Sequence, residues 1–163
     1  MNPTSATYPT IIVIFGITGD LPSKKILPAL FQLHREKRLP SFFRIMGMSR
    51  RELNEEQFRK HIEQVLVGKG QDKHDELEIA AFLDICSFER GMFSEAEAYE
   101  RLAARLGRQD GEWKTCANKL FYLSVDPELY PEICEYLESS GLTKPCGPGE
   151  GWTRVIVEKP IGM

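Results

Sequence analysis

Short apolar runs alternate with amphipathic segments along this chain. Residues 11–15 (IIVIF) are β-branched and aromatic and show no period-two alternation, which is typical of a strand buried on both faces of a parallel sheet. Similar runs at residues 42–48, 83–88, 119–125 and 153–157 predict four further strands.

Helix signals fill the segments between these runs. Asn54 stands where an N-cap is expected, and Gly68 can end the helix that follows it. Ser94 and Glu97 have capping-box spacing, and Gly107 is a plausible terminator for their helix. The pattern predicts helices at residues 24–37, 53–67, from 94 to about 106, and 129–137, with a further helical stretch before the third run.

The alternation of strand and helix predicts an α/β fold of the Rossmann type. Such a fold is doubly wound, with a mainly parallel sheet and helices on both faces. Residues 1–10 are polar and are expected to form a flexible leader, and residues 11–163 are expected to form one domain. A full Rossmann unit has six strands and five are predicted here, so we expect the sheet to be incomplete at its C-terminal end, with an exposed apolar edge.

Composition excludes several classes of function. Hydrophobic residues make up 42% of the chain and charged residues 28%, as in ordinary globular proteins. The net charge of −3 gives no excess of positive charge that would attract nucleic acid or an acidic membrane. No apolar run approaches the ~20 residues that a membrane span needs. The N-terminus lacks the basic segment and the apolar segment of a signal peptide. We therefore expect a cytoplasmic protein with no nucleic-acid or membrane partner.

The cysteines do not form a metal-binding pattern. No two of them make a C-x-x-C pair, and the histidines do not complete a ligand set, so no metal site is expected. In a cytosolic protein the expected state of all four is the reduced thiol. The residues concerned are Cys86, Cys116, Cys134 and Cys146, with His34, His61 and His74.

A glycine turn directly follows the first predicted strand, in the sequence GITGDLPSKK. Gly16 and Gly19 would let the backbone turn tightly and bring its N–H groups against a phosphate, with a helix N-terminus behind them. Ligands of doubly wound sheets bind at this end of the strands. The motif is G-x-x-G and falls short of G-x-G-x-x-G, so a plain strand-to-helix turn stays open as an alternative.

The second strand ends in GMSRREL, which bears on the choice of cofactor. NAD-dependent dehydrogenases place a carboxylate here for the ribose, whereas NADP-dependent ones place an arginine for the 2′-phosphate. Arg50 and Arg51 precede the first acid, Glu52, and guanidinium binds phosphate through paired hydrogen bonds. This favours NADP, with NAD still possible and a solvated basic turn as the alternative.

Four blocks in order make the chain similar to the glucose-6-phosphate dehydrogenase family. VIFGITGDLPSKKILPAL resembles that family's first strand and turn, and MGMSRREL resembles its G-x-x-R segment. NKLFYLSVDPELY resembles its N-R-L-F-Y-L-A-x-P-P segment, and TRVIVEKPIG resembles its E-K-P-F-G hallmark. Pro22, Ser23 and Asp126 depart from the common pattern.

The resemblance implies roles for individual residues. Arg50 would hold the 2′-phosphate of NADP, and Tyr130 would touch the cofactor. Lys159 of the E-K-P block would contact both the cofactor and the sugar phosphate substrate. The residues that would cradle the pyrophosphate and ribose are Gly16, Thr18, Gly19, Asp20 and Leu21.

The resemblance also implies an activity for the full-length protein. Members oxidise glucose 6-phosphate to 6-phosphogluconolactone with reduction of NADP, the first step of the oxidative pentose phosphate pathway. Their catalytic histidine lies in an R-I-D-H-Y-L-G-K-E segment, which these 163 residues do not contain. We therefore expect no catalytic residue in this chain and no activity from it alone. A C-terminal substrate and dimerisation domain is expected in the parent, which is expected to be a homo-oligomer.

Other classes of function are alternatives to a dehydrogenase domain. A small single-domain NAD(P)-dependent sugar epimerase or reductase would need a Y-x-x-x-K pair, and none is present. A non-catalytic NADPH-sensing module would have a decayed E-K-P block, whereas this block is intact. A phosphate-loop kinase is excluded because Asp20 follows Gly19 where that motif needs lysine.

Overall fold

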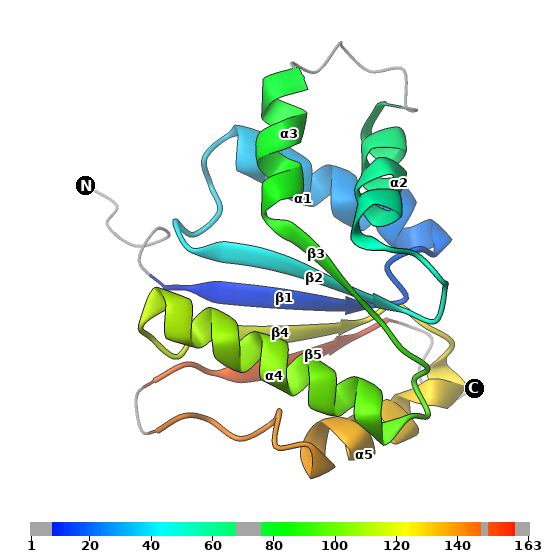
Figure 1. Ribbon diagram of the computed structural model, residues 1–163, viewed down its shortest axis with the longest axis vertical. Coiled ribbons are helices and arrows are strands. Elements are labelled where there is room, and N and C mark those ends of the chain that lie inside the picture. Colours follow the sequence, from blue (N-terminus) through cyan, green and yellow to red (C-terminus); the bar gives the residue numbers. More distant parts are fainter. Residues whose placement is uncertain (1–7, 68–75, 148–149, 159–163) are drawn as a thin grey trace.

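Five parallel strands form a single sheet in the order β3–β2–β1–β4–β5 (Figure 1). The computed structural model describes residues 8–67, 76–147 and 150–158. The fold is α/β and Rossmann-like, as the sequence predicts. Thr10, expected to lie in the leader, already belongs to the first strand. The strands are β1 (Thr10–Phe15), β2 (Phe43–Ser49), β3 (Cys86–Arg90), β4 (Asn118–Leu123) and β5 (Thr153–Val157).

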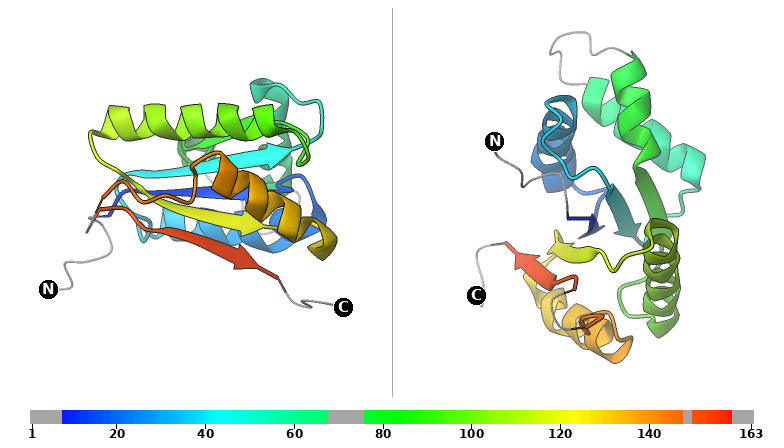
Figure 2. Two further views of the ribbon diagram at one scale, coloured as in Figure 1. Left: turned by 90° about the horizontal axis from the view of Figure 1, so that it is seen from below. Right: turned by 90° about the vertical axis from the view of Figure 1, so that its left-hand side faces the viewer.

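Helices cover both faces of the sheet, α1, α2 and α3 on one face and α4 and α5 on the other (Figures 1 and 2). Alternate side chains of β1 enter two separate cores: Val13 and Phe15 pack with α4 and α5, and Ile12 and Ile14 with the opposite helices. This is why the first run shows no polar alternation. The helices are η1 (Pro22–Ile26), α1 (Leu27–Arg35), α2 (Glu55–Val67), α3 (Glu76–Asp84), α4 (Ala96–Trp113), η2 (Pro127–Leu129) and α5 (Tyr130–Ser139).

The outer strand β5 exposes apolar side chains to solvent. It pairs with β4 alone within the described residues. Val155, Ile156 and Val157 are 40%, 37% and 37% exposed. An apolar sheet edge on this side is what the sequence predicts, and such an edge is a ready template for pairing with another strand.

The first helix opens with a π-helical turn, which the sequence analysis missed. Helical dihedrals are present at Leu21, ahead of the predicted start at residue 24. The Leu27 N–H donates to the Pro22 carbonyl five residues earlier. Pro28 has no N–H, and its ring crowds the carbonyl four residues before it, so the regular ladder is interrupted here and the turn widens.

The predictions for α2 and α4 differ in outcome. Asn54 and Gln57 exchange reciprocal backbone-to-side-chain hydrogen bonds of 2.9 and 2.8 Å, which confirms the N-cap of α2; Gly68 lies outside the described residues.

The prediction for α4 is wrong at both ends. Glu95, and not Ser94, is its N-cap and makes no side-chain capping bond. The helix runs through Gly107 because that position is on the solvent side, where a Cβ would meet nothing within 4 Å.

Two histidines are expected to make stability depend on pH. Burial lowers the pKa of His34, although Glu78 partly opposes the shift, and burial with the nearby Arg51 lowers the pKa of His61. The folded state therefore binds fewer protons than the unfolded state just below pH 6.5, so the free energy of unfolding is expected to fall as the pH drops through that range. Urea unfolding at pH 7.5 and 5.5 measures this change. A His34→Gln, His61→Gln variant should show a smaller change, and an equal change would contradict the assignment.

Candidate functional site

The turn after β1 lies at the carboxyl edge of the sheet, between the ends of β2 and β4. The Gly16 N–H donates to the Met48 carbonyl at 2.8 Å, and the Ser124 N–H donates to the Phe15 carbonyl at 3.0 Å. These bonds tie the ends of three strands together at the point where the strand order reverses. Open α/β sheets bind their ligands at such a point.

Gly16 can only be glycine in this turn. Its φ is +79°, in the left-handed region, and a Cβ would overlap the Ser124 carbonyl oxygen and lie 3.0 Å from Val125 Cγ1. Gly19 donates its N–H to the Gly16 carbonyl at 2.9 Å and is exposed. At these two glycines the chain reverses direction without side chains and then enters a helix N-terminus. This arrangement is suited to binding a phosphate.

Pro22 and Ser23, which depart from the common family pattern, stabilise this helix start. Pro22 is buried in the first helical turn, where its missing N–H costs nothing. The Ser23 hydroxyl donates to the Gly19 carbonyl at 2.8 Å, which braces the turn. Asp126 behaves similarly elsewhere: its carboxylate accepts from the Glu128 N–H at 3.1 Å and caps the 3₁₀ turn η2.

The ends of β1 and β2 are linked by hydroxyl groups. Thr18 Oγ1 and Ser49 Oγ lie 3.0 Å apart, and the Arg51 N–H donates to Ser49 Oγ at 3.2 Å. Ser49 is 3% exposed, so this link is well shielded. Arg50 and Arg51 are both exposed beside it. Sequence reasoning found the arginines but missed Ser49, whose role appears only once the strands are paired.

A third arginine comes to this edge from β3. Arg90 stands opposite Ser49 in the parallel register, and its guanidinium contacts the Glu52 carboxylate at 2.7 Å. The Gly91 N–H donates to the Ser49 carbonyl at 3.0 Å. The register thus places Arg90 at the same corner of the edge as the segment that carries Arg50 and Arg51. Forty residues separate Arg90 from Arg50, so no sequence motif joins them.

Two tyrosines hold the segment that follows β5. Tyr130, 9% exposed, accepts a hydrogen bond from the Glu158 N–H at 3.2 Å through its hydroxyl. The Tyr122 hydroxyl donates to the Glu158 carboxylate. Tyr122 and Glu158 were not singled out from the sequence. Lys159 lies outside the described residues, so its predicted contacts are not tested.

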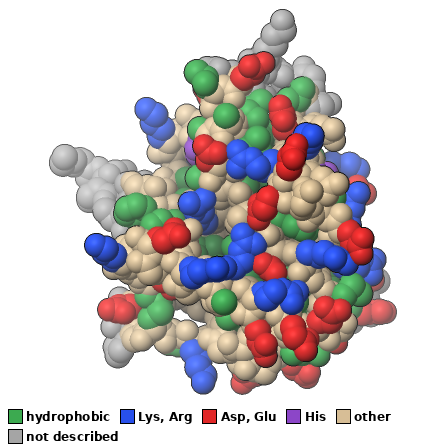
Figure 3. All heavy atoms as spheres, viewed as in Figure 1, with side chains coloured by type: hydrophobic (Ala, Val, Ile, Leu, Met, Phe, Trp, Pro, Cys, Tyr) green, Lys and Arg blue, Asp and Glu red, His purple; other side chains and the backbone are tan. Residues whose placement is uncertain are grey.

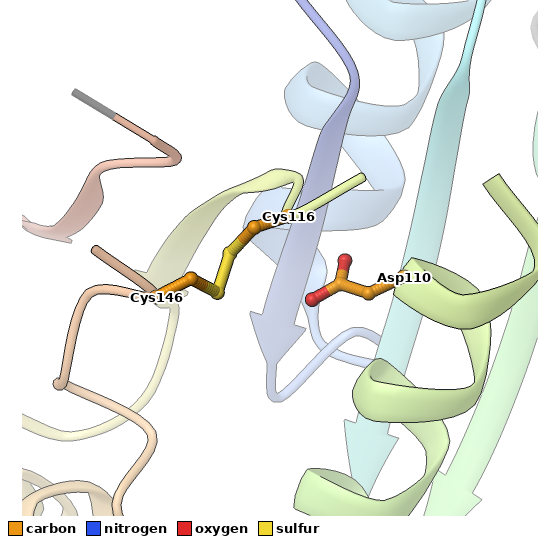
Figure 4. Close-up of side chains that lie close together, drawn as sticks. All are labelled: Asp110, Cys116 and Cys146. Carbon is orange, nitrogen blue, oxygen red and sulfur yellow. A yellow bond between two sulfur atoms is a disulfide. The ribbon is translucent and has the colours of Figure 1, made fainter. Parts of the chain in front are cut away.

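At the opposite, amino edge of the sheet, two cysteines form a disulfide (Figure 4). The expectation that all cysteines are free is therefore wrong for Cys116 and Cys146, because the fold brings the segment before β5 against the start of β4. Cys86 and Cys134 are free. Asp110 lies close to the pair, but its carboxylate is engaged by the Lys119 ammonium and both sulfurs are bonded to each other. These three residues do not form a metal site in this state.

Comparison with known proteins agrees with this geometry. A family model described as "Glucose-6-phosphate dehydrogenase, NAD binding domain" matches residues 13–163. The chain belongs to this family. It is 37% identical to glucose-6-phosphate 1-dehydrogenase of Chlamydia muridarum over 166 residues, covering 100% of this chain and 33% of that protein. It is 34% identical to glucose-6-phosphate 1-dehydrogenase 2 of Mycobacterium bovis over 154 residues, or 94% of this chain and 30% of that protein.

Solved structures of the same family share the fold. One is described as glucose-6-phosphate dehydrogenase in complex with its substrate glucose-6-phosphate; it has a TM-score of 0.83 and 33% identity, covering 98% of this chain and 32% of that one. A glucose-6-phosphate 1-dehydrogenase from Mycobacterium avium gives a TM-score of 0.78 at 27% identity. The chain thus spans about a third of the length of these relatives. Family membership makes the glycine turn part of a nicotinamide-cofactor domain.

The surface outside the site carries mixed charge. On the face shown in Figure 3, basic and acidic side chains intermingle. Arg105 of α4, for example, pairs with Glu89 at 3.0 Å and Glu55 at 3.3 Å. Within the described ranges, no helix has the length and apolarity needed to cross a membrane.

Proposed function

We propose that this domain binds NADP and serves a glucose-6-phosphate dehydrogenase, which oxidises glucose 6-phosphate to 6-phosphogluconolactone. The observation that carries the proposal is the Gly16 turn at the switch point of the sheet, with Arg50 exposed at the end of the neighbouring strand. The family match over residues 13–163 supports the reaction. When bound, the cofactor accepts a hydride from C1 of the sugar.

The residues around the turn suit the parts of this cofactor. Backbone N–H groups at Asp20 and Leu21 would hold the pyrophosphate, because a helix N-terminus favours negative charge, whereas the Gly19 N–H is bonded to the Gly16 carbonyl and shapes the turn. Thr18, held by Ser49, would face the same group. Arg50 would hold the 2′-phosphate that distinguishes NADP from NAD, since a guanidinium can make two parallel hydrogen bonds to it.

The tyrosine pair is proposed to act on the other side of the site. By anchoring Glu158, Tyr130 and Tyr122 would set the direction in which Lys159 leaves the end of β5. Lys159 is proposed to contact both the cofactor and the sugar phosphate, and Tyr130 to touch the cofactor; both assignments rest on the family resemblance. A buried tyrosine hydroxyl that fixes a backbone N–H is well suited to such positioning.

The proposal extends to the setting of the full-length protein. Both reactants are charged phosphates that a membrane retains, which supports a cytoplasmic location. The homo-oligomeric state rests on the family resemblance. The catalytic base is likewise proposed to lie in a part of the full-length protein other than these 163 residues, since none of them matches the family's histidine segment.

Replacing Arg50 with alanine tests the cofactor assignment. We expect the affinity for NADP to fall by about 1.5–3 kcal/mol and the affinity for NAD to change little, because only NADP carries the phosphate that the guanidinium contacts. Isothermal titration calorimetry of the 163-residue chain with each nucleotide measures both.

Arg38→Ala is the matched control for this experiment. Arg38 follows α1, away from the carboxyl edge, and its only ion pair within the described residues is with Glu36. The substitution removes the same charge and should leave both affinities unchanged. Equal losses of NADP and NAD affinity in Arg50→Ala would contradict the 2′-phosphate assignment. Failure of the folded wild-type chain to bind either nucleotide would contradict the proposed function.

A further inference from the structure

A disulfide-bonded cysteine pair lies at the edge of the sheet opposite the proposed cofactor site. Cys116 immediately precedes β4, and Cys146 lies in the connection between α5 and β5, with their Cα atoms 6.2 Å apart (Figure 4). We propose that this pair is a site of reversible thiol–disulfide exchange with low-molecular-weight thiols. The inference rests on the cytoplasmic location proposed above, because intracellular disulfides in most organisms are transient or redox-sensing.

The two sulfur atoms are not equivalent. Cys146 is exposed and open to an incoming thiol, whereas Cys116 is partly buried. The Lys119 ammonium lies 3.8 Å from Cys116 Sγ and is itself held by the Asp110 carboxylate. This ammonium favours a thiolate on Cys116, although the Asp110 carboxylate, whose oxygen lies within 4.8 Å of both sulfurs, offsets part of that effect. The difference in access therefore assigns attack to Cys146 and departure to Cys116.

The exchange proceeds in two steps that balance. In the first, an external thiolate attacks Cys146 Sγ, the Cys116–Cys146 bond breaks, and Cys116 leaves as a thiolate beside Lys119. In the second, another external thiolate attacks the external sulfur of the mixed disulfide and releases Cys146 as a thiolate. Two external thiols thereby become one disulfide, and the protein gains two electrons and two thiols. Oxidation is the reverse, with a low-molecular-weight disulfide as the oxidant.

The bond secures the entry to β5. Beside it, Gly151 sits so close to β4 that a Cβ there would lie 2.8 Å from the Cys116 carbonyl oxygen. The Trp152 N–H donates to Asn118 Oδ1 at 2.9 Å, and the Lys119 N–H donates to the Trp152 carbonyl at 2.9 Å. Reduction would remove the covalent link, and these hydrogen bonds would then hold the amino end of β5 against β4. The carboxyl end of the same strand leads to Glu158.

The remaining cysteines do not compete for exchange with this pair. Cys86 is 5% exposed, and burial raises the pKa of its thiol to about 12, so it stays protonated and shielded. Cys134 is exposed on α5, but partial burial of its thiol raises the pKa of that group as well. A thiol with a raised pKa forms little thiolate at neutral pH and exchanges slowly.

The first experiment counts reactive thiols in the whole 163-residue chain. The chain is equilibrated with oxidised and then with reduced glutathione, alkylated with iodoacetamide, and read by peptide mass spectrometry. We expect Cys116 and Cys146 to be unlabelled after oxidised glutathione and both labelled after reduced glutathione, with Cys86 unlabelled throughout. If both stay labelled after oxidised glutathione, or both stay unlabelled after an excess of reduced glutathione, the proposal fails.

The second experiment tests the polarity of the exchange. The oxidised chain is treated briefly with reduced glutathione, quenched with N-ethylmaleimide, and the mixed disulfide is located by peptide mass spectrometry; we expect glutathione on Cys146 and the alkylated thiol on Cys116. Glutathione found mainly on Cys116 would overturn the assignment of attack.

Charge variants test the role of the ammonium. Lys119→Met should slow reduction of the disulfide by roughly tenfold, because the leaving thiolate loses its stabilising charge. Should this variant fold poorly, Asp110→Asn keeps the ammonium and an acceptor for the Ala117 N–H, and should react faster than the wild type because the opposing carboxylate charge is gone. Lys144→Met, a nearby exposed control, should react at the wild-type rate. Wild-type rates in a folded Lys119→Met chain would remove Lys119 from the mechanism.

Discussion

Replacing Gly16 with alanine is expected to lower the free energy of unfolding by roughly 2–5 kcal/mol and to abolish measurable NADP binding. About 1–2 kcal/mol comes from placing a side chain at a φ of +79°. A further 1–3 kcal/mol comes from the overlap of the new Cβ with the Ser124 carbonyl. That carbonyl is hard to displace, since the Ser124 N–H is bonded to Phe15. Urea unfolding and calorimetric titration measure the two effects.

Gly141→Ala separates the two causes. Gly141 has the same φ of +79°, but a Cβ there would meet nothing within 4 Å. This variant should therefore lose only about 1–2 kcal/mol, the cost of the backbone conformation, and should bind nucleotide normally. If the two variants lose equal stability, close packing of the turn against β4 is not what restricts position 16.

Truncating Phe15 to alanine is expected to cost about 3–5 kcal/mol, a large part of the stability of a small domain. Phe15 is fully buried, and its ring lies 5.7 Å from Phe93, 6.1 Å from Tyr99 and 6.4 Å from Phe121. It is also the residue whose carbonyl holds Ser124, so the cavity would form directly beneath the glycine turn. Thermal and urea unfolding followed by circular dichroism would show the loss.

Phe42→Ala is the control for this truncation. Phe42 is 51% exposed and contacts the Trp113 ring at 5.6 Å. The Phe42→Ala variant loses the same atoms from a site that water already reaches. We therefore expect its free energy of unfolding to fall by about 1 kcal/mol. A loss in Phe15→Ala no larger than that in Phe42→Ala would mean that the aromatic cluster can collapse around the missing ring.

Apolar patterning was enough to predict the sheet. Strands of a parallel sheet are buried on both faces, so they appear as unbroken runs such as residues 11–15 and 119–125. The N-cap at Asn54 was equally readable, because a capping interaction is local. Local signals failed for α4, where burial of Tyr99 and Leu102 determines the helix and outweighs both the Ser94 cap and the glycine at 107.

Contacts between distant segments were the part of the site that sequence could not supply. The glycine turn and Arg50 were visible because each is a short motif after a strand. Ser49, Arg90 and the Tyr122–Glu158 contact depend on strand pairing, which local patterns do not specify. The disulfide is the same kind of case: spacing alone does not say which cysteines meet, and the prediction of free thiols came from the expected compartment.

The strand order has a consequence for how the chain folds as it is synthesised. β1 is made first but occupies the centre of the sheet, with Thr10 paired to Phe43 on one side and to Asn118 on the other. One edge of the most hydrophobic strand therefore stays unpaired until more than a hundred further residues have emerged from the ribosome. During that interval the nascent chain presents an open β edge, and the order of synthesis makes this stage the one at which chaperones would be needed most.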